Sequence, residues 1–266
     1  MKKRIKVGLA LGSGGIRGLA HIGVIKTLLK YEIPIDYIAG ASIGAWVGAH
    51  YALFQDIAML ETVTVGSKKE KLAAFFDPSL RGGLIGGVKM KKLLGQWLQD
   101  GVFEQTKIPL AVVATDINKR ETCVFSTGSL VPAVQASMAI PGVFKPILYQ
   151  DRVLVDGAVS NPVPSDVVRS MGADIVIGVN LYRVPEDVTH VTTDIGLVDV
   201  TRRTMEILRY YLAKHSTASA DVVIEPAVEA YAGWSRYFTR DIGQEIVGIG
   251  EKEAEVHMPS IMKLLG

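Results

Sequence analysis

The first fifty or so residues alternate between short apolar runs and helical stretches, and this order limits the possible folds more than any other feature. Ile5 to Leu11 is an apolar run that ends in glycines, and Asp36 to Ala39 is a second such run. Helical stretches follow them at Arg17 to Tyr31 and at Ile43 to Phe54. Strands that alternate with helices predict a parallel sheet covered on both faces. We therefore expect an α/β protein with a parallel-rich central sheet, in a three-layer α/β/α arrangement.

The rest of the chain continues this pattern around one irregular segment. Residues 56–105 are mostly helical with a glycine-rich break at 81–87, which indicates a helical insertion rather than a second domain. The 266 residues suffice for one large domain, and we expect a single one over 1–266. The part after about residue 180 carries no assignable motif. Further strands are expected at 110–115, 121–125, 145–148, 152–155, 174–180 and 222–225, and further helices at 131–139, 192–216 and 242–265.

Charge and composition exclude one large class of partner. The chain has 29 Lys and Arg against 27 Asp and Glu and no long basic block, so nothing indicates nucleic acid binding. Its single cysteine, Cys123, cannot form an intrachain disulfide, which fits a reducing compartment. The N-terminal apolar run is too short for a membrane span and lacks a cleavage pattern. We expect a cytoplasmic protein that could touch the inner face of a membrane, and its oligomeric state stays open.

Residues Gly40 to Gly44 have the G-x-S-x-G pattern of a nucleophile elbow, with a strand before it and a helix after it. In this context Ser42 would sit on a strained turn, with its hydroxyl above the sheet and at the positive end of a helix dipole. Gly40 and Gly44 would let neighbouring chain approach closely. The pattern predicts Ser42 as a nucleophile; the alternative is that Ser42 only caps the second helix.

A glycine-rich loop, Gly12 to Gly18, follows the first strand. Such a loop can hold the phosphates of a dinucleotide, or it can stabilise an oxyanion with backbone N–H groups. The dinucleotide interpretation fails, because Arg17 stands where the third glycine belongs and the second strand ends in Gly40 instead of an acidic residue. Adjacent parallel strands would place this loop beside Ser42. We therefore expect an oxyanion hole, and neither a cofactor nor a metal.

The hydroxyl of a nucleophilic serine needs a base within hydrogen-bond reach. None of the five histidines, at 21, 50, 190, 215 and 257, stands at the end of a clear strand, where a base is usually held. Asp156 does, because it ends the apolar run Val153 to Val155, and the small residues Gly157 and Ala158 follow it. Asp156 is therefore the candidate base; the alternative is that it only caps a turn.

These three elements, in this order, resemble the patatin-like phospholipase family, and the resemblance covers roughly residues 5–180. Ser13 stands where the family usually has the first glycine of a triple, a departure that compact bacterial members tolerate. The matching stretches are Ser13-Gly14-Gly15-Ile16-Arg17-Gly18, Gly40 to Gly44 and Asp156-Gly157-Ala158, with further familial stretches at His21 to Val24, Ala136 to Gly142 and Gly172 to Asp174.

The resemblance implies a lipid acyl hydrolase of the phospholipase A, lysophospholipase or carboxylesterase type. It implies that Ser42 attacks an ester carbonyl while Asp156 takes its proton, without a histidine. The N–H groups of Gly14, Gly15 and Ile16 would hold the oxyanion. Arg17 would orient the loop or meet an anionic head group.

Two other functions stay open. One is an ordinary α/β-hydrolase esterase whose Ser-Asp-His triad is completed by a histidine such as His257. The spacing of 27 positions from Gly15 to Ser42 disfavours it, because it leaves room for only one strand–helix unit. The other is a non-catalytic regulatory or adaptor protein on the same fold.

Two segments are candidates for contact with a membrane or with an acyl chain. In Lys89 to Gln99, apolar residues fall on one helical face with lysines around it. This face could rest on an anionic membrane or cover an acyl pocket, although packing on the core is the favoured interpretation. The second segment is aromatic and basic. The residues concerned are Met90, Leu93, Leu94, Trp97, Leu98, Lys89, Lys91 and Lys92 in the first segment, and Tyr231, Trp234, Tyr237, Phe238, Arg236 and Arg240 in the second.

Overall fold

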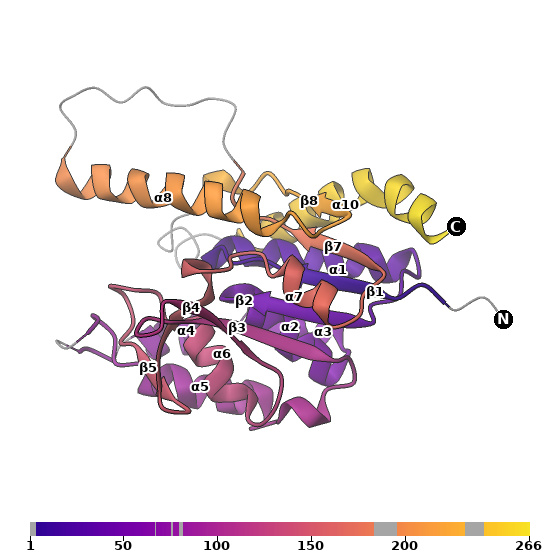
Figure 1. The fold of residues 1–266 in the computed structure, drawn as a ribbon. Coiled ribbons are helices and arrows are strands. Elements are labelled where there is room, and N and C mark those ends of the chain that lie inside the picture. The colour runs from indigo at the N-terminus through magenta and orange to yellow at the C-terminus, as the bar shows by residue number, and fades with distance from the viewer. Residues whose placement is uncertain (1–3, 67, 76, 80–81, 184–195, 232–241) are drawn as a thin grey trace.

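The computed structural model describes residues 4–66, 68–75, 77–79, 82–183, 196–231 and 242–266 (Figure 1). Within these residues eight strands form one sheet, in the order β5-β6-β3-β2-β1-β7-β8, with β4 paired to β3. The strands are β1 (Val7–Leu11), β2 (Tyr37–Ala41), β3 (Leu110–Asp116), β4 (Glu121–Phe125), β5 (Ile147–Tyr149), β6 (Arg152–Asp156), β7 (Ile175–Val179) and β8 (Val222–Ile224).

The centre of the sheet is parallel and one side of it is antiparallel. Strand β1 pairs in parallel with β2 and β7, β2 pairs with β3, and β7 pairs with β8. Strand β3 pairs antiparallel with β4 and β6, and β5 with β6. The expected parallel-rich α/β fold is therefore confirmed. The helices are α1 (Ala20–Lys30), α2 (Ile43–Phe54), α3 (Ile57–Val65), α4 (Lys68–Phe75), α5 (Val88–Leu98), α6 (Leu130–Ser137), α7 (Ser165–Ser170), α8 (Leu197–Ser216) and α10 (Gly243–Leu265).

The two faces of the sheet have side chains of different size, because successive residues of a strand point to opposite faces. One face carries large aliphatic residues such as Leu9 and Leu11, and it packs against α1, α2, α5, α6 and α10. The other face carries small residues such as Ala10, Ala39 and Ala111, and it packs against α7 and the end of α8. Helices thus cover both faces, as expected.

Local differences from the sequence-based expectations have simple causes. The helix expected from Arg17 begins as a 3-10 turn, Gly15–Leu19, before α1. Helix α7 was not expected, because six residues are too short to show a helical period. The hairpin does turn at Gln150 and Asp151, whose φ angles of 51° and 58° suit a tight two-residue turn.

Some expectations fall on parts of the chain outside the description. Residues 192–195 of the expected long helix lie there, and α8 begins at Leu197. His190 and most of the aromatic segment (Trp234, Arg236, Tyr237, Phe238 and Arg240) also lie outside the described residues. Among the described helices, none combines the length and the apolar character needed to cross a bilayer.

Candidate active site

Two strands meet end to end on the same edge of β3, and this meeting creates the site. Strand β4 occupies one edge of β3 along residues 112–116. Strands β2 and β6 therefore share the other edge and run toward each other. The last residue of β2, Ala41, pairs with Val113, and the last residue of β6, Asp156, pairs with Ala114. Ser42 follows Ala41 directly, so the fold brings Ser42 and Asp156 together across 114 positions of sequence.

The hydroxyl of Ser42 donates a hydrogen bond to Oδ2 of Asp156, with 2.6 Å between the oxygens. Both side chains are buried. Ser42 has φ 54° and ψ −121°, a combination that a non-glycine residue adopts only under strain. Its side chain makes no capping bond to α2, so the interpretation of Ser42 as a helix cap is wrong. Asp156 does cap a turn, because its Oδ1 accepts a hydrogen bond from the N–H of Ala158 at 2.8 Å.

The environment of Asp156 favours a carboxylate that exchanges its proton near neutral pH. Burial raises the pKa of Asp156 to about 6, although the hydrogen bonds from Ser42 and Ala158 and the charge of Arg209 lower it. A group with such a pKa is mostly ionised at pH 7 and takes up a proton readily. The backbone of Asp156 is fixed as well, since its N–H donates to the carbonyl of Ala139 at 2.9 Å.

Ser137 ties the nucleophile turn to the sheet. Its hydroxyl accepts a hydrogen bond from the N–H of Ser42 at 2.8 Å and donates one to the carbonyl of Val113 at 2.6 Å. Ser137 is fully buried at the end of α6. The sequence placed this residue in a familial stretch but gave it no role, because one serine in an apolar helix carries no visible signal.

The glycines beside Ser42 and Asp156 are required by close approaches of the backbone. A Cβ on Gly44 would lie 2.1 Å from the carbonyl oxygen of Leu11, and one on Gly157 would lie 2.3 Å from that of Val113. Real Cβ atoms do not approach oxygen so closely, so larger residues would separate these segments. Gly40 packs in the same way against the backbone of Gly44.

The glycine loop lies beside Ser42 and contains backbone N–H groups that have no acceptor among the described residues. The N–H groups of Gly12 and Ser13 are used, since they donate to carbonyls of β7 and of Pro162 at 3.0 and 2.8 Å. The N–H groups of the next three residues, Gly14, Gly15 and Ile16, have no acceptor among the described residues. Gly15 and Ile16 line the same cavity as Ser42. The loop and the serine are thus neighbours, as the parallel pairing of β1 with β2 predicts.

Side chains hold this loop from behind. Nε2 of His21 lies 2.7 Å from the carbonyl oxygen of Gly12, and burial lowers the pKa of His21 to about 4. The ring is therefore neutral at pH 7, and Nε2 donates the hydrogen bond. Arg17 donates from Nε to the carbonyl of Gly14 at 3.1 Å and stacks over the ring of Tyr182. Of the two roles expected for Arg17, orienting the loop is the one that these contacts favour.

The other histidines lie elsewhere. His50 is buried in α2 between the rings of Trp46 and Phe54. His257 lies on α10, where its Nε2 is 3.4 Å from Glu253, and His215 is exposed on α8. Within the described residues, none of them forms a hydrogen bond with Ser42 or Asp156, which contact each other directly.

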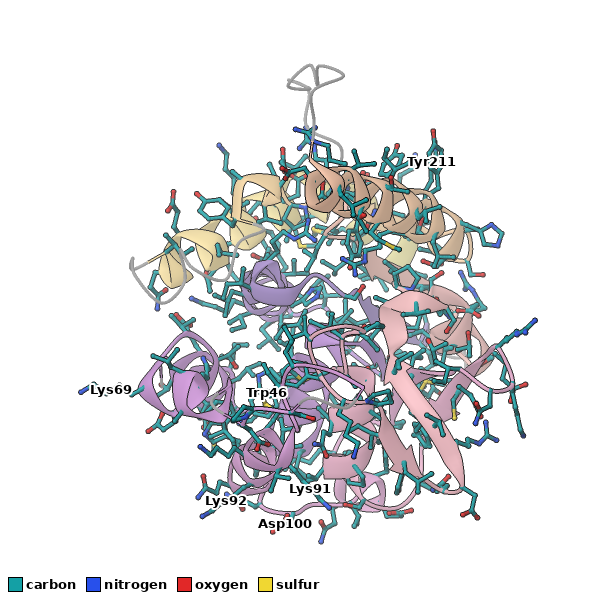
Figure 2. All side chains as sticks on the ribbon, turned by 90° about the vertical axis from the view of Figure 1, so that its left-hand side faces the viewer. Trp46, Lys69, Lys91, Lys92, Asp100 and Tyr211 are labelled. Carbon is teal, nitrogen blue, oxygen red and sulfur yellow. The ribbon has the colours of Figure 1, made fainter. Side chains whose placement is uncertain are left out.

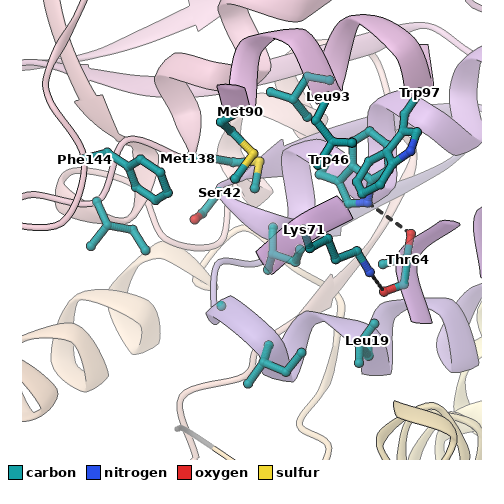
Figure 3. A pocket seen from close by; sticks show the side chains of 15 residues that line it. Leu19, Ser42, Trp46, Thr64, Lys71, Met90, Leu93, Trp97, Met138 and Phe144 are labelled. Carbon is teal, nitrogen blue, oxygen red and sulfur yellow. Dashed lines mark hydrogen bonds between the residues drawn. The ribbon is translucent and has the colours of Figure 1, made fainter. Parts of the chain in front are cut away.

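A cavity of about 70 Å³ opens beside Ser42, and its lining is almost entirely apolar (Figure 3). The polar groups of its wall bond to one another: Trp46 donates to the hydroxyl of Thr64 at 3.0 Å, and Lys71 donates to the carbonyls of Thr64 and Gly66. The lining is Gly15, Ile16, Leu19, Ser42, Ile43, Trp46, Thr64, Lys71, Met90, Leu93, Leu94, Trp97, Met138, Ile140 and Phe144.

Helix α5 forms one wall of this cavity. Its residues Met90, Leu93 and Leu94 are buried, so they pack on the core and cover the cavity at the same time. The favoured interpretation, that this segment packs on the core, is confirmed. The interpretation of this apolar face as a membrane contact is wrong, because it is buried. The lysines 89, 91 and 92 point to solvent.

Comparisons with known proteins identify the family of the chain. The family described as patatin-like phospholipase matches residues 9–169, a range that contains the glycine loop, Ser42 and Asp156. An uncharacterized NTE family protein of Mycobacterium tuberculosis is 36% identical over 180 residues, which cover 66% of this chain and 49% of that protein. Patatin-like phospholipase domain-containing protein 6 of Homo sapiens is 31% identical over 182 residues, which cover 66% of this chain and 13% of that protein.

The chain thus spans about half the length of the mycobacterial relative and a small part of the human one. Among solved structures, VipD from Legionella pneumophila has a similar fold, with a TM-score of 0.51 at 15% identity. The likeness covers 97% of this chain and 67% of VipD. Because the family match covers more than half of the sequence, the chain belongs to the patatin-like phospholipase family.

Proposed function

We propose that this protein is a lipid acyl hydrolase in which Ser42 and Asp156 act as a two-residue catalytic unit. The observation that carries the proposal is the 2.6 Å hydrogen bond from Ser42 to Asp156 beside an apolar cavity. A serine on a strained turn, a carboxylate with a pKa near 6 and unused N–H donors are the components that acyl transfer needs. The proposed substrate is an ester whose acyl chain enters the cavity.

In the proposed reaction Asp156 takes the proton of the Ser42 hydroxyl while Oγ attacks the ester carbonyl carbon. The negative oxygen of the tetrahedral intermediate accepts hydrogen bonds from the N–H groups of Gly14, Gly15 and Ile16. The intermediate collapses, and the alcohol leaves with the proton from Asp156. Water then gives a proton to Asp156, attacks the acyl-serine and releases the carboxylic acid, and the proton returns to Ser42.

The apolar lining suits a hydrocarbon chain better than a polar acyl group, because a polar group there would lose its bonds to water. This supports a lipid or another long-chain ester as the substrate. Phospholipid, lysophospholipid and neutral lipid differ in the alcohol part, which lies outside the cavity.

The test uses the purified chain with a p-nitrophenyl ester and a panel of lipids. We expect Ser42→Ala and Asp156→Asn each to lower kcat/KM by about a thousand-fold, as removal of a nucleophile or a base does. The matched controls are Ser126→Ala and Asp151→Asn, two exposed residues outside the three motifs, which should leave the rate unchanged. Undiminished turnover by Ser42→Ala would refute the proposal. A fluorophosphonate probe that fails to label Ser42 in the wild type would favour a non-catalytic protein.

A further inference from the structure

Helix α8 exposes a row of large apolar side chains to solvent. Leu197, Val200, Ile207, Leu208 and Tyr211 are between 43 and 83% exposed. At about 100° of rotation per residue, their spacing places all five within roughly one third of the helix circumference. We name these five residues the α8 stripe. Thr204 interrupts this row between Val200 and Ile207, and an exposed apolar row of this length marks an interaction site on a protein surface.

The orientation of α8 is the reverse of that of an ordinary surface helix, which turns its apolar side to the core. The side of α8 that contacts the body carries Ala213, which is buried, and Arg209 and Tyr210, which are half-buried. The acidic residues of the helix, Asp199 and Glu206, are about half a turn away from the centre of the stripe. In Figure 2, Tyr211 lies at the outer edge of the molecule and points away from it.

The charges around the stripe favour an anionic lipid surface as its partner. The outward half of α8 contains no carboxylate, and the exposed Lys214 and His215 lie at its C-terminal end. Helices that lie in a membrane interface combine an apolar face containing aromatic side chains with basic residues beside it. Lysine next to the stripe would meet lipid phosphates, whereas an acidic partner protein would need more basic residues than this half offers.

Helix α8 also lies close to the candidate active site. The charge of Arg209, on its inner side, lowers the pKa of Asp156 and of Tyr182. In Figure 1 the N-terminal end of α8 lies on the side of the molecule at which β1 and β2 end, the side that carries Ser42.

From these observations we infer that the α8 stripe docks the protein onto an anionic bilayer. The inference rests on the proposed function for its choice of partner. The stripe inserts its apolar side chains among the acyl chains, and Lys214 contacts the head groups.

The experiment compares the wild type with the double variant Ile207→Glu/Leu208→Glu. The matched control is Val256→Glu, an equally exposed apolar residue on α10, which covers the opposite face of the sheet. Co-sedimentation is measured with vesicles of phosphatidylglycerol and phosphatidylcholine, and hydrolysis with those vesicles and with a soluble p-nitrophenyl ester. We expect the double variant to lose at least ten-fold in vesicle binding and in vesicle hydrolysis, with the soluble ester turned over within two-fold of the wild-type rate.

Two results would overturn the inference: equal vesicle binding by the wild type and the double variant, or a wild-type dimer in light scattering that the double variant converts to monomer. The second result would assign the stripe to a second copy of the chain. Failure of the proposed function is distinguishable, because the wild type would then bind vesicles through the stripe but hydrolyse neither substrate.

Discussion

At the scale of single residues, the site depends on a carboxylate that the fold has removed from water. Asp156 is buried beside Ser42, and its two oxygens are occupied by the Ser42 hydroxyl and the Ala158 N–H. Neither bond comes from a cation, so desolvation is the largest influence on the pKa of Asp156. The pH range in which the carboxylate can accept a proton follows from this environment.

The rate of ester hydrolysis should therefore decrease as the pH falls through about 6, the pKa of Asp156. Protonated Asp156 cannot take the proton of Ser42, so we expect kcat/KM for a neutral soluble ester to reach half of its plateau near that pH. The measurement is a profile from pH 4.5 to 8.5, with circular dichroism at each pH to verify that the chain stays folded. A rate that stays constant down to pH 4.5 would argue against Asp156 as the base.

Ser137 is a positioning residue, because it contacts the backbone of Ser42 and does not itself line the cavity. Ser137→Ala leaves the Ser42 N–H and the Val113 carbonyl without their partner, which costs about 1–3 kcal/mol of stability. We expect kcat for a soluble ester to fall about ten-fold or more at an unchanged KM, since the turn loosens while the acyl cavity stays intact.

Two measurements separate positioning by Ser137 from a loss of folded protein. Ser137→Cys retains a donor and a weak acceptor and should recover part of kcat. Ser170→Ala, another serine at a helix end, is the control for the general loss of a hydroxyl. If Ser137→Ala lowers only the melting temperature, the role is structural.

At the scale of elements, the sequence predicts the parts that repeat a pattern and misses those that depend on distant partners. The strand, loop and helix order around Ser42 follows from apolar runs and glycines, and β5 and β6 follow from the turn at Gln150 and Asp151. The end-to-end meeting of β2 and β6 could not be predicted, because it depends on β4 occupying the other edge of β3. The sequence thus identifies Ser42 and Asp156 as candidates but not the reason for their contact.

Helix contacts were harder to predict than helix positions. The apolar face of α5 has the same pattern whether it meets the core, a cavity or a membrane, and only the structure shows that it meets the first two. Similarly, His21 looks like a packing histidine in sequence, yet its Nε2 holds the carbonyl of Gly12. The signal that could have found this role is the position of His21 three residues after the loop, in the helix that follows it.

Helix α5 should set the length of acyl chain that the site accepts. Leu93 is buried and lines the cavity, so Leu93→Trp fills space that the end of a chain would occupy. We expect the ratio of kcat/KM for a p-nitrophenyl octanoate to that for the acetate to fall about ten-fold, with the acetate rate nearly unchanged. The exposed neighbour Lys92→Ala is the control. An unchanged ratio would place the acyl chain outside this cavity.

At the scale of the whole molecule, two buried histidines and the buried Asp156 change the stability in opposite directions as the pH falls. The layer of α1 and α2 contains His21 and His50, two buried histidines whose pKa values burial lowers to about 4. Unfolded histidine has a pKa near 6.5. The unfolded chain therefore binds these protons first, and the stability that each neutral histidine allows is lost as the pH falls from about 6.5 to 4. Asp156 has a raised pKa, so the folded chain binds this proton first, and its protonation adds stability as the pH falls below about 6.

We expect urea denaturation to show a free energy of unfolding that decreases from pH 7 to pH 4. His50 has no hydrogen-bond partner on either ring nitrogen within the described residues. The variant His50→Leu therefore removes the contribution of His50 to the pH dependence of stability without breaking a hydrogen bond. We compare the free energy of unfolding of the variant with that of the wild type at two pH values. The difference between the two proteins should favour the variant by up to about 3 kcal/mol more at pH 4 than at pH 7.5. Identical pH dependence in both proteins would contradict the buried, neutral state of His50. That the chain forms one domain stays a prediction, which a single unfolding transition in this experiment would support.

Because β2 and β6 lie far apart in the sequence, Ser42 and Asp156 are synthesised at different times. A ribosome that has made the chain as far as β5 has already released Ser42 and its elbow, but Asp156 does not yet exist. The contact between the two residues is among the long-range ones, which form late in folding. During synthesis Ser42 therefore stays without Asp156, its proposed base, until β6 pairs with β3. The pairing of β6 with β3 and the contact between Ser42 and Asp156 therefore form in one step, before β7 and β8 complete the sheet.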